Sequence, residues 1–276
     1  MRPSDINDNA ARDVFSRVLT RGDARIEYRI AGSGPSVVLI PSLGRGAEDF
    51  DLLAADMAQS GYRVLRPEPR GIGGSSPLRE SDTLHDMAAD IAAIIEAENS
   101  APAILVGHAA GNWVARVLAH DRPDLTRAVA LVAAIVTQAP SDDIRASISG
   151  SFDPSLSDAE RLVHLQRAYF APGADARVWL DGWWPGVARK QREAARLTTD
   201  NSWKPVAQAH PTFYLGAADD VISPPPTLGE LRAAIGPNAS LAVVPQAGHA
   251  LLPEQPRAVT ACLHEWMSRL DPVSDD

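Results

Sequence analysis

Short apolar runs alternate along most of the chain with longer segments whose apolar residues recur at helical spacing. Residues 36–40 and 128–132 are continuous apolar runs, which are typical of strands buried on both faces of a sheet. The segment 26–30 instead alternates apolar and polar residues, as a half-buried strand does. These patterns predict strands at 26–30, 36–40, 62–65, 103–106, 128–132, 211–215 and 241–244.

Helical spacing fills the intervals between these strands. In residues 84–99, for example, Met87, Ile91 and Ile95 fall on one stripe. Helices are predicted in the same way at 48–59, 84–99, 110–120, 226–235 and 257–270, and a short one at 10–19 within a leader segment of about 24 residues. This alternation predicts an α/β fold with a mostly parallel sheet covered by helices on both faces.

The alternation stops between about residues 137 and 204. Helix-like pieces occur there at 158–169, 174–180 and 187–197, without a convincing strand. A helical insertion between sheet strands predicts a cap, or lid, over the carboxyl edge of the sheet, where ligands bind in such folds. We therefore expect a core domain made of residues 1–136 and 205–276, and a helical cap made of residues 137–204.

The turn Gly107-His108-Ala109-Ala110-Gly111 carries the strongest functional signal. It follows a predicted strand and precedes a predicted helix, which is the context of the G-x-S-x-G nucleophile turn. The glycines allow a sharp turn and close packing of the helix against the sheet. Ala109 stands where the attacking serine would be expected, so a methyl group replaces the hydroxyl.

An acid and a base follow in the order that this turn requires. His249 comes just after the predicted strand 241–244, which suits a general base. Two carboxylates after the strand 211–215 could orient it: the spacing Asp-x-Ile-x-Pro favours Asp220, whereas counting from Gly216 favours Asp219. The predicted catalytic positions are therefore Ala109, His249 and Asp220 or Asp219.

Further residues are candidates for oxyanion and substrate binding. The loop 41–46 follows the strand 36–40, and the backbone N–H groups of Leu43 and Ala110 should face a developing oxyanion. In the same loop, Ser42 could hydrogen-bond the substrate and Arg45 could pair with a substrate carboxylate. The expected aromatic lining is Trp113 from the core and Trp179, Trp183 and Trp184 from the cap, which favours an apolar or aromatic substrate.

These motifs resemble those of the α/β-hydrolase superfamily over roughly residues 25–270. Further matches are the segment 70–75, which is similar to an R-G-x-G-x-S loop, and Gly248-His249 followed by Glu254. The chain departs from the usual pattern where Pro41-Ser42 replaces a His-Gly pair, and at Ala109. It also resembles a bacterial subgroup with a Gly-His-Ala-x-Gly-Asn turn. The resemblance implies a cofactor-free hydrolase acting on an ester-like, lactone or C–C substrate.

Three explanations of Ala109 stay open at this point. The chain could be a serine hydrolase whose nucleophile was changed to alanine, or an enzyme in which His249 and the carboxylate activate water. It could also be a non-catalytic binder or receptor that keeps the pocket. The presence of the acid, the base and the oxyanion loop favours the two enzymatic explanations.

Composition narrows the partners. The 276 residues are 45% hydrophobic, enough for a sizeable core, and the formal net charge of −9 argues against nucleic-acid or anionic-membrane partners. One cysteine cannot form an internal disulfide, and no apolar run is long enough to span a membrane. No metal-ligand cluster, phosphate loop or dinucleotide fingerprint is evident. We expect a cytoplasmic protein with a small-molecule substrate and no cofactor; the sequence leaves its oligomeric state open.

Overall fold

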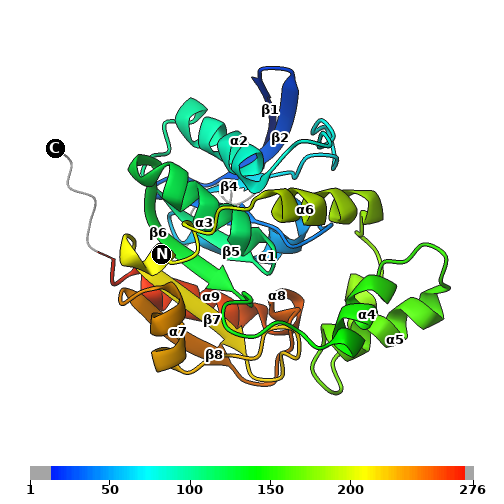
Figure 1. Cartoon of the computed structure of the whole chain (residues 1–276). Helices are drawn as coiled ribbons and strands as arrows, with labels where there is room; N and C mark the ends of the chain where they lie inside the picture. The colour runs from blue at the N-terminus through cyan, green and yellow to red at the C-terminus, as the bar shows by residue number, and fades with distance from the viewer. Residues whose placement is uncertain (1–13, 271–276) are drawn as a thin grey trace, which may run out of the picture.

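The computed structural model describes residues 14–270, which form a mostly parallel sheet between two layers of helices (Figure 1). The sheet has eight strands in the order β1-β2-β4-β3-β5-β6-β7-β8. Only the β1–β2 and β2–β4 pairs are antiparallel. The strands are β1 (Phe15–Arg21), β2 (Ala24–Ala31), β3 (Ser36–Ile40), β4 (Arg63–Pro67), β5 (Ala103–His108), β6 (Thr126–Val132), β7 (Thr212–Ala217) and β8 (Ala239–Val244).

Helices cover both faces because the central strands are apolar on both sides. On one face α2 (Leu84–Ala97), α3 (Gly111–Asp121) and α7 (Leu228–Ile235) share a core cluster with the sheet. On the other face α1 (Asp51–Gln59), α8 (Leu251–Glu254) and α9 (Pro256–Met267) share a second cluster. Short 3-10 helices η1 (Ala47–Phe50), η2 (Pro123–Leu125) and η4 (Val206–Gln208) join these elements. The predicted α/β-hydrolase architecture is thereby confirmed.

The chain between β6 and β7 is helical among the residues that the structure describes. It contains α4 (Asp142–Gly150), α5 (Asp158–Ala168), η3 (Ala176–Trp179) and α6 (Pro185–Leu197). Figure 1 shows α4 and α5 set apart from the sheet, and α6 on the side of α2 and α3. The sequence pattern indicated helical pieces near α5, η3 and α6 but missed α4, whose apolar positions are few.

The helix predicted at 10–19 is wrong where the structure describes it. Residues 15–21 form β1, an edge strand that pairs with β2 in an antiparallel hairpin. Arg21 pairs with Ala24 across a two-residue turn at Gly22-Asp23, and Gly22 adopts φ +61°. A positive φ at a two-residue hairpin turn favours glycine, so this turn was the signal for the hairpin. The first four residues of that predicted helix lie outside the described residues.

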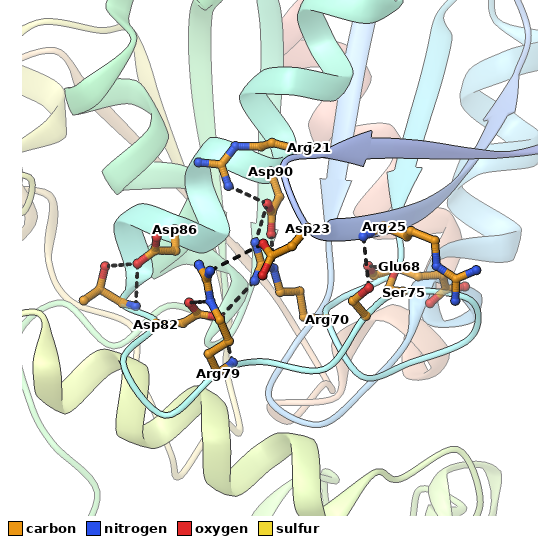
Figure 2. A network of polar contacts seen from close by, with 12 residues as sticks. Arg21, Asp23, Arg25, Glu68, Arg70, Ser75, Arg79, Asp82, Asp86 and Asp90 are labelled. Atoms are coloured by element: carbon orange, nitrogen blue, oxygen red, sulfur yellow. Dashed lines mark hydrogen bonds and ion pairs between the residues drawn. The ribbon is translucent and has the colours of Figure 1, made fainter.

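The loop after β4 is fixed by a buried network of charges (Figure 2). Arg70 donates to Asp90 at 2.6 Å and 2.9 Å and to Asp82 at 2.9 Å, and all three side chains are buried. Ser75 Oγ accepts the N–H of Glu27 and donates to the carbonyl of Glu68. Arg70 and Ser75, which carry the R-G-x-G-x-S likeness, therefore hold this loop in place.

Candidate active site

The chain turns sharply at Ala109, between the end of β5 and the start of α3. Ala109 has φ +46°, a left-handed conformation that costs a non-glycine residue about 1–2 kcal/mol. The flanking glycines are needed for close packing. A β-carbon at Gly111 would lie 2.3 Å from the carbonyl oxygen of Ile40, and one at Gly107 would lie 2.7 Å from the backbone of Asn112.

Hydrogen bonds at Ala109 and Asn112 hold this strained turn. The N–H of Ala109 donates to the carbonyl of Val132 at 2.8 Å, which ties the turn to the end of β6. The side-chain amide of Asn112 donates to the carbonyl of Ala109. A conformation of this kind persists only where its surroundings fix it, and such strain is typical of functional sites. Ala109 lines a cavity and belongs to none of the three apolar core clusters among the described residues.

His249 and Asp220 meet beside this turn. The His249 Nδ1 atom lies 2.9 Å from Asp220 Oδ2, and both side chains are buried. Asp220 Oδ1 also accepts the N–H groups of Ile222 and Ser223, at 2.8 Å and 2.9 Å. The Ser223 hydroxyl donates to Oδ2 at 2.7 Å. Burial alone would raise the pKa of Asp220, but its contacts with His249 and Ser223 outweigh burial and lower that pKa.

The hydrogen bonds separate the two candidate carboxylates. Asp219 is exposed, and its backbone N–H donates to the carbonyl of Ala247. Asp220 is the one whose carboxylate contacts His249. Because Asp220 carries only acceptors when ionised, the shared hydrogen must reside on His249 Nδ1. The other ring nitrogen, Nε2, is then free to accept a proton.

His108 lies behind the turn and supports His249. Its Nε2–H donates to the carbonyl of His249 at 3.0 Å. Burial, reinforced by the proximity of His249, lowers the pKa of His108 to about 3. His108 is therefore neutral at ordinary pH, and it braces the backbone that carries the second imidazole.

The loop after β3 presents backbone donors to the same place. Gly44 donates its N–H to the side-chain oxygen of Gln191 on α6, at 2.7 Å. Within residues 14–270 no acceptor is present for the N–H of Leu43 or of Ala110. Both residues line the cavity next to Ala109.

The cavity beside Ala109 has a volume of about 490 Å³, which suits a small organic molecule. Of the predicted site residues it is lined by Ser42, Leu43, Ala109, Ala110, Trp113 and His249. The other lining residues were not among the predicted site residues; they are Asn112, Ala133, Ile135, Ala139, Pro140, Arg145, Ile148, Ser149, Tyr169, Arg192 and Ile222. The described residues contain no group of three or more acidic, histidine or cysteine side chains that could hold a metal ion.

Arg45 is buried outside this lining, contrary to its expected place at the substrate. It pairs with Asp49 at 2.9 Å, donates to the carbonyl of Asp181 at 2.6 Å, and lies within 5 Å of the ring centres of Trp179 and Trp183. A guanidinium with these partners has little left to offer a substrate carboxylate. The sequence could not show this, because Asp181 and both indoles come from the insertion.

The three tryptophans of the insertion that were predicted to line the site also lie outside the cavity lining. Trp179 packs against Tyr169 and against His108, with ring centres 5.5 Å and 6.0 Å apart. Trp183 stacks on Phe152, and Trp184 is 44% exposed in a separate surface groove. Packing accounts for these side chains better than ligand contact, and Tyr169 is the insertion aromatic that reaches the cavity.

The left-handed turn lies between a strand and a helix, and the buried pair is formed by an aspartate after β7 and a histidine after β8. This chain order matches the arrangement typical of α/β hydrolases. The chain belongs to the alpha/beta hydrolase family, whose model matches residues 37–261. None of the described helices is long and apolar enough to cross a membrane.

Known proteins with similar sequences or folds include enzymes of several kinds. The pyrrolizixenacetamide deacetylase of Xenorhabdus hominickii is 26% identical over 74% of this chain and 80% of its own. A non-heme haloperoxidase of Rhodococcus erythropolis is 24% identical over 82% of this chain and 89% of its own. A thermophilic esterase from Thermogutta terrifontis shares the fold, with a TM-score of 0.73, 22% identity, and coverage of 94% of this chain and all of its own.

Proposed function

We propose that this protein is a hydrolase without a serine nucleophile, in which His249 activates water for attack on the carbonyl of a small substrate. The observation that carries the proposal is the buried hydrogen bond between His249 and Asp220, beside a cavity that also contains Ala109. A pocket used only for packing has no need of a buried imidazole–carboxylate pair at 2.9 Å.

The proposed reaction uses the free nitrogen of His249 as a general base. As the oxygen of a bound water molecule forms its bond to the substrate carbonyl carbon, one water proton passes to Nε2. Asp220 stabilises the resulting imidazolium through Nδ1–H, as in a Ser-His-Asp enzyme. The negative charge on the carbonyl oxygen is stabilised by the N–H groups of Leu43 and Ala110. Collapse of this intermediate breaks the bond to the leaving group, which takes the proton from His249.

The missing hydroxyl at Ala109 leaves space for the attacking water molecule. Alanine differs from serine by a single oxygen atom, so the space at its methyl group lies where a nucleophilic hydroxyl would have been. The turnover should be modest, since loss of the serine in enzymes that depend on it costs on the order of 10⁶-fold. The deacetylase among the relatives supports acyl hydrolysis as the class of reaction, and the cavity lining supports a small, largely apolar ester or amide.

The test compares the parent protein with Ala109→Ser on a panel of aryl esters and anilides, with intact-protein mass spectrometry after rapid mixing. The proposal expects turnover by the parent without any acylated protein. Ala109→Ser should instead accumulate an acyl-enzyme. A parent that is inert, beside an active Ala109→Ser variant, would mean that the chain is a disabled serine hydrolase. Tight ligand binding with no product from either protein would mean a binder.

A further inference from the structure

The cavity beside Ala109 carries positive charge in a protein whose formal net charge is −9. Arg145 and Arg192 line it, and among the described residues no aspartate or glutamate does. The carboxylate of Asp220 lies behind His249 and is taken up by four donors. The rest of the described lining is apolar, hydroxyl or amide in character, apart from the imidazole of His249, so the two guanidinium groups are its only permanently charged side chains.

Arg192 lacks a carboxylate partner within residues 14–270, although it belongs to an acidic protein. It lies on α6 with its guanidinium 5.4 Å from the centre of the Phe152 ring. It also lies close enough to Tyr169 for its charge to oppose the rise in the pKa of that phenol, which burial raises to about 12. The Tyr169 ring is in turn 5.7 Å from the ring of His249, so Tyr169 lies between the arginine and the imidazole that line this cavity.

Arg145 is similarly available. It lies on α4, and its Nε atom donates to the carbonyl of Pro140 at 2.9 Å, which fixes the base of the guanidinium. Its one carboxylate neighbour, Asp142, is 3.8 Å away and fully exposed, so that pair is weak. The terminal nitrogens of Arg145 therefore remain free to donate to a ligand.

We infer that Arg145 and Arg192 form a subsite for a carboxylate, and that the substrate is a small apolar acid carrying its hydrolysable carbonyl at the other end. A planar guanidinium matches the two oxygens of a carboxylate, and both arginines line the cavity while remaining exposed to solvent. The inference that the substrate has a hydrolysable carbonyl rests on the proposed function. The carboxylate subsite concerns binding alone and can be tested without turnover.

The test measures binding of non-hydrolysable acids by calorimetry, with 3-phenylpropionate and 4-phenylbutyrate as probes and their primary amides as neutral partners. Each acid should bind the parent at least tenfold more tightly than its amide. Arg145→Gln and Arg192→Gln should each weaken acid binding by about three- to fivefold, the range for ion pairs at exposed side chains. The double variant should bind acid and amide equally.

The matched control is Arg189→Gln, which removes an exposed arginine of the same helix that does not line this cavity. It should leave the preference for the acid intact. Equal binding of acid and amide by the parent, no binding of either at millimolar concentration, or a preference that survives in the double variant would each overturn the subsite. A parent protein that turns over no ester or anilide but still prefers the acid would refute hydrolysis and leave the subsite standing.

Discussion

Replacement of Asp220 by asparagine should silence His249 by reversing one hydrogen bond. Asp220 Oδ1 accepts two backbone N–H groups, at 2.8 Å and 2.9 Å, whereas Oδ2 accepts from His249 and from the Ser223 hydroxyl. The asparagine oxygen has to occupy the Oδ1 position, because two backbone donors point at it. Its NH₂ group then faces His249 Nδ1 and donates to it.

That reversal moves the imidazole hydrogen to the wrong nitrogen. With Nδ1 accepting, His249 carries its hydrogen on Nε2 and cannot take a proton from water. We expect turnover to fall by about 10⁴-fold, which corresponds to about 5.5 kcal/mol of barrier. The fold should survive, because the Ser223 hydroxyl can rotate to accept. The cost in unfolding free energy should be about 1–3 kcal/mol.

The tautomer can be read directly by ¹⁵N NMR of histidine-labelled protein, so the measurement needs no substrate. The parent should show His249 with its hydrogen on Nδ1, and Asp220→Asn should show it on Nε2. Asp219→Asn is the matched control and should leave the spectrum of His249 unchanged. An unaltered tautomer in a folded Asp220→Asn protein, or full turnover by it, would refute the assignment of Nε2 as the base.

Three further predictions concern stability and positioning. Because the folded pKa of His108 is about 3, the unfolded state binds one more proton than the folded state between about pH 6.5 and 3. The free energy of unfolding should therefore fall by about 1.4 kcal/mol per pH unit in this range through His108 alone. In urea unfolding, His108→Gln should show a smaller loss of this free energy on acidification, and an unchanged loss would contradict the prediction. Glu254→Gln should lower both kcat and melting temperature, since each Glu254 oxygen accepts a backbone N–H, from Gly248 or Ala171, at 2.8 Å; wild-type values for both would count against the role. Arg70→Met should cost about 3 kcal/mol in urea unfolding by leaving two buried aspartates without their shared cation; a loss under 1 kcal/mol would show that other partners suffice.

Much of the fold could be predicted because the backbone geometry of strands and helices sets the spacing of apolar residues along the chain. The runs at 36–40 and 128–132 became the buried strands β3 and β6, with the same bounds or nearly so. β1 was not predicted because a short, exposed edge strand with three apolar residues has no clear apolar period. The glycine turn after it was the feature that indicated a hairpin. α4 was not predicted because this helix is mostly exposed and has few apolar residues to set a period.

The site residues that follow strand ends could be predicted from the sequence, whereas those that depend on tertiary packing could not. Ala109 and His249 each follow a strand, so the order of strand ends along the sheet brought them together. Asp219 and Asp220 could not be separated by spacing, because one residue along a loop reverses the direction of the side chain. The cavity walls from α4 and α6 depend on how the insertion packs on the core, which no local pattern encodes. The placement of Arg145 and Arg192 in the cavity lining could therefore not be predicted from the sequence.

The most direct test of the whole account is the steady-state rate of ester hydrolysis by the parent protein, with Ala109 in place, measured beside His249→Ala. We expect the parent to exceed the buffer rate clearly, and His249→Ala to lose that excess by at least about 10³-fold while staying folded. A parent rate equal to buffer, or an excess that survives the loss of the imidazole, would contradict water activation at this site.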